Sequence, residues 1–237
     1  MTTNSRTILV TGASRGIGRA ISKRLLHESC RVIGVSRKPI ELESDNFTSI
    51  AMDLSDINQL PDQIRKLRSA HPEIDGIVCN AGLGRFGSLE EFSPQQIQRM
   101  LDLNITSQLI LLREFLPHLK AKGSGDIIMM GSEAALSGGR KGVVYCATKF
   151  AMRGAAQALR DECANSGVRV GIINPGMVDT DFFSEAWFNP GPEPDMHLVA
   201  EDVADAAWLM LSARPGAAID EINLSPQKKV IEFKNKS

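Results

Sequence analysis

The sequence lacks the features that mark several common classes of protein. Its four cysteines include no CxxC pair, which argues against a disulfide framework and predicts reduced thiols in a cytoplasmic protein. The four histidines lie far apart, without HxxxH or HExxH spacing, so we expect no metal site. With 27 Lys and Arg against 28 Asp and Glu, the chain has no basic excess for binding nucleic acid. No apolar run approaches the ~18 residues that cross a membrane.

What the chain does have is an alternation of two patterns. Short runs rich in β-branched residues alternate with longer stretches whose apolar residues recur at helical spacing. We expect strands at residues 7–11, 31–35, 48–52, 76–79, 126–130, 168–173 and 219–224, and helices at 17–26, 57–67, 94–120, 143–164 and 200–211. This alternation predicts an α/β protein with a mostly parallel, doubly wound sheet of about seven strands and helices on both faces. Because no linker divides the chain, residues 1–237 are expected to form a single domain.

A glycine-rich turn follows the first expected strand. Gly12 allows a tight turn, while Gly16 and Gly18 let the backbone approach a ligand and the sheet closely. The helix that begins here offers free N–H groups and a partial positive charge to a pyrophosphate. The alternative is a tight turn that binds nothing, and the spacing also departs from GxGxxG because three residues separate the first two glycines.

This TGxxxGxG spacing resembles the short-chain dehydrogenase/reductase family, and further motifs of that family follow in its order. They are Asp53-Leu54, Asn80-Ala81-Gly82, Asn104, Ser132, the YxxxK pair Tyr145 and Lys149, and the Pro-Gly motif at residues 175–180. The resemblance implies a Rossmann fold that binds a nicotinamide dinucleotide. The residues that it places at the cofactor are Gly12, Ser14, Arg15, Gly16, Ile17, Gly18, Ser36, Arg37, Asp53, Leu54, Asn80, Ala81, Gly82, Tyr145, Lys149, Pro175, Gly176, Val178 and Thr180.

The expected catalytic group is built around Tyr145, the only tyrosine. Lys149 lies four residues later on the same helix face, and its ammonium is expected to lower the phenol pKa from its usual value of ~10. Such a tyrosine can exchange a proton with a carbonyl or hydroxyl oxygen. Ser132, just after a strand, would orient that oxygen. For Asn104 the resemblance implies a water-linked proton relay to Lys149.

The second expected strand indicates which coenzyme is preferred. NAD-binding Rossmann domains usually place an acidic residue at its end to bind the ribose 2′-OH. Here that position is Ser36, and Arg37 follows it. An arginine attracts a 2′-phosphate, and Arg15 in the glycine-rich turn resembles a second basic residue of NADP-preferring relatives. We therefore predict NADPH as the cofactor.

The substrate side is expected near residues 180–198, an irregular stretch with three prolines that we interpret as a mobile lid. Four of the twelve aromatic residues fall within it: Phe182, Phe183, Trp187 and Phe188. They either contact an apolar substrate or anchor the lid. Glu133 either recognises a polar or cationic substrate group or faces solvent. The lysine-rich tail at 227–237 is expected to fray. Small residues on several faces of helix 143–164 predict a homodimer or homotetramer.

These features lead to one functional prediction and two rivals. The prediction is an NADPH-dependent oxidoreductase that reduces a ketone or aldehyde to an alcohol, or catalyses the reverse. One rival is a 3-oxoacyl-carrier-protein reductase, with Arg140, Lys141 and Arg153 facing the acidic carrier. The other is a dinucleotide-sensing regulator without chemistry, although such proteins typically lose the tyrosine. The only other partner expected is a small-molecule substrate, with no nucleic acid and no membrane.

Overall fold

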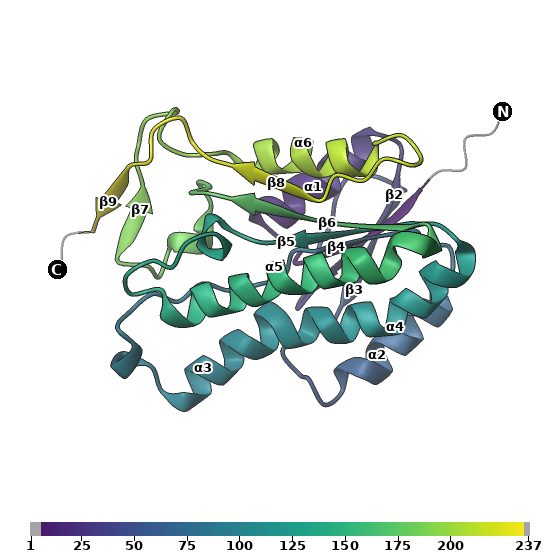
Figure 1. The fold of residues 1–237 in the computed structure, drawn as a ribbon, viewed down its shortest axis with the longest axis horizontal. Coiled ribbons are helices and arrows are strands. Elements are labelled where there is room, and N and C mark those ends of the chain that lie inside the picture. The colour runs from purple at the N-terminus through teal and green to yellow at the C-terminus, as the bar shows by residue number, and fades with distance from the viewer. Residues whose placement is uncertain (1–5, 235–237) are drawn as a thin grey trace.

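Seven strands lie side by side in one sheet, and every pairing between them is parallel (Figure 1). The structure, a computed structural model, describes residues 6–234. The strands are β1 (Thr7–Thr11), β2 (Arg31–Ser36), β3 (Phe47–Ala51), β4 (Gly76–Cys79), β5 (Gly125–Met130), β6 (Val168–Pro175) and β8 (Glu221–Leu224). Their order is β3-β2-β1-β4-β5-β6-β8. The chain first adds strands on one side of β1 and then, from β4 onward, on its other side. This is the doubly wound Rossmann arrangement that the sequence predicts, with ligands expected at the carboxyl ends of the strands.

Helices cover both faces of the sheet, because β1 is apolar on both sides. Ile8 and Val10 belong to a core shared with α1 (Gly16–His27) and α6 (Ala200–Leu211). Leu9 points the other way, into a core shared with α2 (Leu60–Ala70), α4 (Ser107–Lys122) and α5 (Val143–Cys163). In Figure 1, α1 and α6 lie above the sheet and α2, α4 and α5 lie below it. Strands buried on both faces explain the continuous apolar runs in the sequence.

The long helix expected at residues 94–120 is divided. It consists of α3 (Pro94–Leu101), a π-helical turn at Asp102–Thr106 and α4. Ser93 caps α3 by accepting a hydrogen bond from the backbone N–H of Gln96 at 3.2 Å. The π turn contains the buried Asn104, whose side chain bonds outside the helix. Such turns are rare and often occur at functional sites.

Three further expectations differ from the structure. Helix α2 begins at Leu60 rather than residue 57, with Pro61 in its first turn, where a missing N–H costs nothing. The lid is not wholly irregular, since it contains a 3₁₀ turn at Asp181–Phe183 and the strand β7 (Phe188–Pro190). The tail does not fray within its described part, because β9 (Ile231–Phe233) pairs antiparallel with β7. Residues 235–237 lie outside the described residues.

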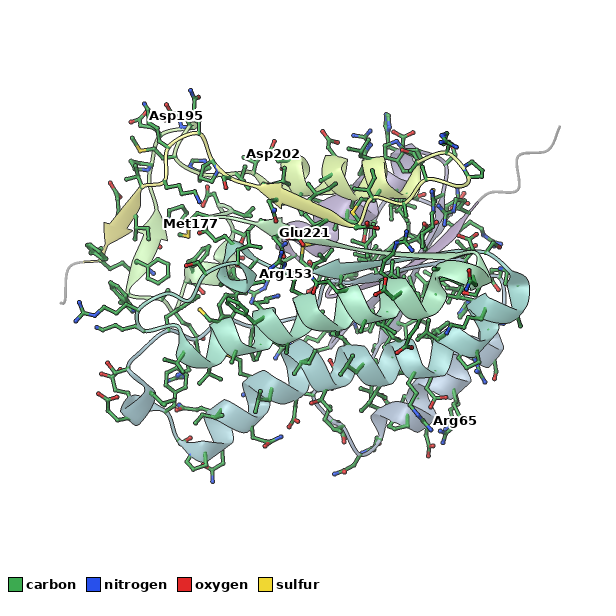
Figure 2. All side chains as sticks on the ribbon, in the orientation of Figure 1. Arg65, Arg153, Met177, Asp195, Asp202 and Glu221 are labelled. Carbon is green, nitrogen blue, oxygen red and sulfur yellow. The ribbon has the colours of Figure 1, made fainter. Side chains whose placement is uncertain are left out.

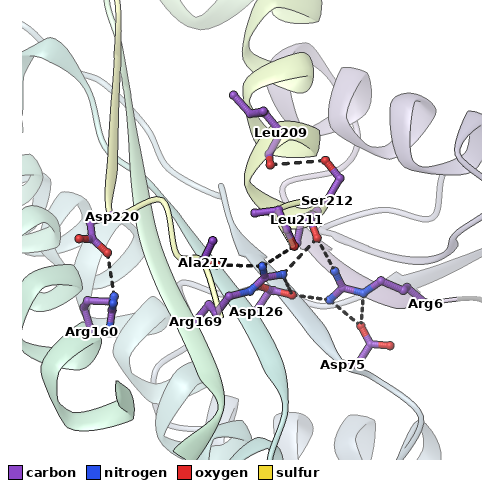
Figure 3. A network of polar contacts seen from close by, with 11 residues as sticks. Arg6, Asp75, Asp126, Arg160, Arg169, Leu209, Leu211, Ser212, Ala217 and Asp220 are labelled. Atoms are coloured by element: carbon purple, nitrogen blue, oxygen red, sulfur yellow. Dashed lines mark hydrogen bonds and ion pairs between the residues drawn. The ribbon is translucent and has the colours of Figure 1, made fainter. Parts of the chain in front are cut away.

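A network of charges closes the amino ends of the central strands (Figure 3). Asp126 on β5 accepts hydrogen bonds from Arg6 at 2.7 Å and from Arg169 at 2.6 Å. Both guanidinium groups also donate to the carbonyl oxygen of Leu211, the last residue of α6, at 3.0 and 3.2 Å. Cations at a helix C-terminus satisfy its free carbonyls. The network therefore fixes α6 at the end of the sheet opposite to the carboxyl ends of the strands.

Candidate active site

A cleft of about 1210 Å³ lies at the carboxyl ends of the strands. It is lined by residues from the ends of β1, β2, β4, β5 and β6, from α5 and from the lid. All but two of the site residues expected from the sequence line this cleft. The exceptions are Gly18 and Asn104. The other residues expected from the sequence therefore share one cleft, and these two lie outside its lining.

The glycine-rich turn brings the start of α1 close to the end of β1, and no side chain caps the first N–H groups of the helix at Arg15. Gly12 has φ +70°, a backbone conformation that residues with a side chain rarely adopt. A Cβ on Gly18 would lie 2.2 Å from the carbonyl oxygen of Gly12, so this glycine permits close packing rather than ligand contact. No acidic residue occupies the first turn of α1. The helix dipole and these N–H groups therefore favour an anion.

Thr11 connects the glycine-rich turn to the segment after β4, and sequence reasoning missed it. Its buried hydroxyl oxygen accepts hydrogen bonds from the backbone N–H groups of Asn80 and Ala81 at 2.9 and 3.0 Å. The Asn80 side chain donates in return to the carbonyl oxygen of Thr11 at 2.9 Å. The signal in the sequence that could have identified Thr11 is its position directly before Gly12. Thr11 and Asn80 thus hold two walls of the cleft together.

Basic side chains gather at the β2 end of the cleft. Ser36 donates a hydrogen bond to the carbonyl oxygen of Lys38 at 2.7 Å, and Arg37 lies beside it on the cleft wall. Hydrogen bonds from Ser55 hold the pKa of Asp53 below its usual value, and the positive charges of Arg37 and Arg99 lower it further. Arg99 also lines the cleft and was not expected from the sequence. This end of the cleft can accommodate an additional negative group.

Tyr145 and Lys149 project from the same face of α5 and are both buried. The Lys149 ammonium donates to the carbonyl oxygen of Met130 at 2.8 Å and lies 5.7 Å from the centroid of the Tyr145 ring. Burial lowers the pKa of Lys149 to about 8.

The pKa of Tyr145 differs from the expectation. Burial raises it to about 12, although a hydrogen bond with Ser132 lowers it. The expected pKa below the usual value of a phenol is wrong, because desolvation of the phenolate outweighs the favourable interactions. Tyr145 is consequently a neutral phenol at ordinary pH, beside a serine at the end of β5. A neutral phenol is able to donate a proton.

Asn104 supports this group without reaching the cleft. Its amide exchanges two hydrogen bonds with the backbone of Leu83, both at 2.8 Å, and donates to the Thr148 hydroxyl at 3.1 Å. Thr148 in turn donates to the carbonyl oxygen of Tyr145 at 2.7 Å. Asn104 thereby braces α5 against the loop after β4. The proton relay from Asn104 to Lys149 stays a prediction.

Aromatic rings surround the Tyr145 end of the cleft. The ring of Phe86 lies 5.2 Å from Tyr145, and that of Phe182 lies 5.8 Å from it. Phe183 and Phe188 are buried and pack against each other. All four phenylalanines and Trp187 nevertheless line the cleft. The lid aromatics therefore anchor the lid, and their position on the cleft wall leaves contact with a substrate as a prediction.

The charged residues noted near the substrate side have defined partners. Glu133 lines the cleft and pairs with Lys229 at 3.4 Å. Arg153 is not part of a basic cluster, because its Nε–H donates to both carboxylate oxygens of Glu221 of β8, at 3.0 and 3.1 Å (Figure 2). This pairing weakens the case for Arg153 as a contact to an acidic carrier. Only Arg140 and Lys141 of the predicted cluster line the cleft.

Within residues 6–234, no group of three or more His, Cys, Asp or Glu side chains is placed to hold a metal ion. Over the same residues, no helix is both long enough and apolar enough to cross a bilayer.

Comparison with known proteins agrees with this geometry. Residues 6–189 match the model of the short chain dehydrogenase family. An uncharacterised oxidoreductase of Staphylococcus epidermidis is 30% identical over 92% of this chain and 96% of its own. An NADP-dependent 3-hydroxy acid dehydrogenase of Schizosaccharomyces pombe is 29% identical, over 94% of this chain and 93% of its own. An alcohol dehydrogenase of the archaeon Thermococcus sibiricus, solved with 5-hydroxy-NADP, superposes with a TM-score of 0.85 at 26% identity, covering 97% of this chain and 100% of its own.

The chain belongs to the short-chain dehydrogenase/reductase family. It is accordingly an NAD(P)-dependent oxidoreductase that acts on CH–OH or C=O groups.

Proposed function

We propose that this protein is an NADP(H)-dependent carbonyl reductase. The observation that carries the proposal is the meeting of Ser132, Tyr145 and Lys149 in one cleft with the anion-binding turn at the start of α1. The cofactor supplies hydride when it is bound. The protein's own residues then have to bind it, orient the substrate and provide a proton.

Tyr145 is the proton donor. Its phenol stays protonated at neutral pH and loses its proton to the carbonyl oxygen as that oxygen gains negative charge, so an alcohol forms. Ser132 holds the same oxygen through its hydroxyl. Lys149 lies close enough to favour the tyrosinate that remains, because its ammonium is 5.7 Å from the ring centroid. The same residues act in the opposite order when an alcohol is oxidised.

The cofactor is NADP(H). Ser36 stands where an acidic residue would repel a 2′-phosphate, and Arg37 and Arg15 both line the cleft, where Arg15 lies 3.8 Å from the carboxylate of Asp181. A planar guanidinium suits a phosphate through paired hydrogen bonds. The NADP dependence of the Schizosaccharomyces pombe relative supports this choice.

We also propose a homodimer or homotetramer that is assembled through α4 and α5. Leu109 and Phe150 are large apolar side chains with 41% and 46% of their surface exposed on these helices. Light scattering of the purified protein tests the assembly, and a strictly monomeric protein would contradict it.

The function is tested by following NADPH absorbance with a panel of ketones and aldehydes, comparing the wild type with Tyr145→Phe. Removing one hydroxyl should leave NADPH binding intact and lower kcat by roughly 10²- to 10⁴-fold. A variant that keeps more than about a tenth of wild-type kcat would contradict the proposed acid. Tight NADPH binding without turnover of any carbonyl would instead favour the non-catalytic regulator.

A further inference from the structure

The last described part of the chain, residues 227–234, forms a strap across the lid beside the cleft. We propose that this C-terminal strap determines substrate specificity by forming an apolar outer wall that selects carbonyl compounds with a large apolar group. The proposal rests on the proposed reductase function and adds a substrate class to it. Its evidence is how the strap is attached and where its side chains point.

Backbone pairing attaches the strap to the lid. Phe188, Asn189 and Pro190 of β7 pair with Phe233, Glu232 and Ile231 of β9. The backbone N–H of Gly191 also donates to the carbonyl oxygen of Val230 at 3.1 Å. In Figure 1, β7 and β9 project together from the body of the protein, away from the seven-stranded sheet. Because Phe188 of β7 is buried among the lid aromatics, this pairing joins the strap to the packed part of the lid.

Lys234 links the strap to the aromatic wall beside Tyr145. Its ammonium donates to the carbonyl oxygens of Phe183 and Ser184 at 2.9 and 3.0 Å, and its backbone N–H donates to the carbonyl oxygen of Trp187 at 2.9 Å. The first two oxygens lie at the end of the 3₁₀ turn that places Phe182 against the Tyr145 ring. The position of the strap therefore affects the wall of the reaction site.

The other end of the strap is attached by charge. The Lys228 ammonium pairs with the carboxylate of Asp195 in the lid at 2.7 Å. Lys229 pairs with Glu133, the residue after Ser132, at 3.4 Å. Glu133 balances the one positive charge that the strap presents to the cleft. The strap thus adds no unbalanced charge of its own to the wall.

Alternation along β9 separates two faces. Lys229, Ile231 and Phe233 line the cleft, while Glu232 lines a separate groove on the other side of the lid. Ile231 and Phe233 are 49% and 67% exposed, and the Phe233 ring stacks on Trp187 at 5.2 Å. Large apolar side chains that are exposed within a cleft gain stability when an apolar ligand covers them. The strap therefore forms a surface for the apolar end of a substrate whose carbonyl lies at Tyr145.

The experiment compares a short aliphatic ketone with a ketone that bears a phenyl or long alkyl group, using the full-length enzyme and NADPH. Phe233→Ala should raise KM for the large ketone by about 10- to 100-fold, because a contact the size of a phenyl ring is lost. Its kcat with the short ketone, and KM for NADPH, should stay within about twofold of wild type. Phe233→Leu, which keeps an apolar side chain, should restore most of the discrimination.

Glu232→Ala is the matched control, because it alters the same strand on the side that faces away from the cleft. It should leave kcat and KM for both ketones unaffected. If Phe233→Ala changes KM equally for the two ketones, or changes neither KM, the role of the strap is overturned while the reductase function stays intact. Failure of the wild type to oxidise NADPH with any ketone would overturn the proposed function itself, and the strap proposal with it.

Discussion

Burial of the Lys149 ammonium in the cleft has a cost to folding, and Lys149→Met should expose that cost. Burial lowers the pKa of Lys149 from 10.5 to about 8, which means that the folded state disfavours its charge. At pH 7 this corresponds to about 3 kcal/mol of destabilisation. Methionine fills a similar volume without a charge. The substitution also removes the hydrogen bond to the carbonyl oxygen of Met130, which is worth about 1.5–3 kcal/mol.

The two effects oppose each other, so the variant should be slightly more stable at pH 7. A net gain of about 1 kcal/mol raises Tm by roughly 2–4 °C in a chain of this size. The variant should also be inactive in NADPH turnover, because the proposed partner of Tyr145 is missing. A more stable but inactive protein would show that Lys149 is retained for function.

The dependence on pH is the stricter test. The cost of the buried charge is fully present below pH 8 and disappears as the pH rises toward 10.5, since above that value lysine is neutral in both states. Wild type should therefore gain stability relative to Lys149→Met, by roughly 2 kcal/mol between pH 7 and pH 9.5. Burial also raises the pKa of Cys79 to about 12, but that contribution is common to both proteins and cancels in the difference.

Urea unfolding at pH 7, 8, 9 and 9.5 measures this difference. Lys66→Met, at an exposed position of α2, controls for the loss of one positive charge. Parallel stability profiles of wild type and Lys149→Met across this range would refute the reasoning, because they would mean that Lys149 titrates alike in the folded and unfolded states.

Three further results are expected. Arg37→Ala should raise KM for NADPH by about 10- to 150-fold and leave KM for NADH nearly unchanged, as one hydrogen bond to a charged group is lost; a wild type that already prefers NADH would contradict this. Asp126→Ala should lower the free energy of unfolding by about 2 kcal/mol in urea titrations, since it leaves two guanidinium groups without their shared partner. KM for NADPH should stay unchanged, because Asp126 lies at the end of the sheet opposite to the cleft. Equal unfolding free energies of wild type and variant would count against the network. Hydrogen exchange in residues 180–198 should slow when NADPH and a ketone bind, and equally slow exchange without ligand would argue against a mobile lid.

The order of elements and the location of the site were accessible from the sequence because both follow from local patterns. Continuous apolar runs define buried parallel strands, and the glycine-rich turn and the YxxxK pair each lie within one short segment. A doubly wound sheet then brings the carboxyl ends of its strands together. This is why residues as distant in the chain as Gly12, Ser132 and Tyr145 line one cleft.

The sequence did not reveal pairings between distant segments. The tail at 227–234 is polar and rich in lysine, so composition predicts fraying, whereas β9 finds a partner about 40 residues earlier in the lid. From the sequence, Arg153 is similarly expected to be a surface charge, whereas in the structure β8 places Glu221 beside it. Such contacts depend on which strands become neighbours, and no local pattern encodes that.

The pKa of Tyr145 shows most clearly which properties follow from the sequence and which depend on the tertiary structure. The sequence by itself determined that a tyrosine and a lysine share a helix face, because four residues make about one helical turn. Only the tertiary structure decided how deeply both are buried. Desolvation depends on everything packed around a group and disfavours its charged form, so burial raised the pKa of Tyr145 and lowered that of Lys149.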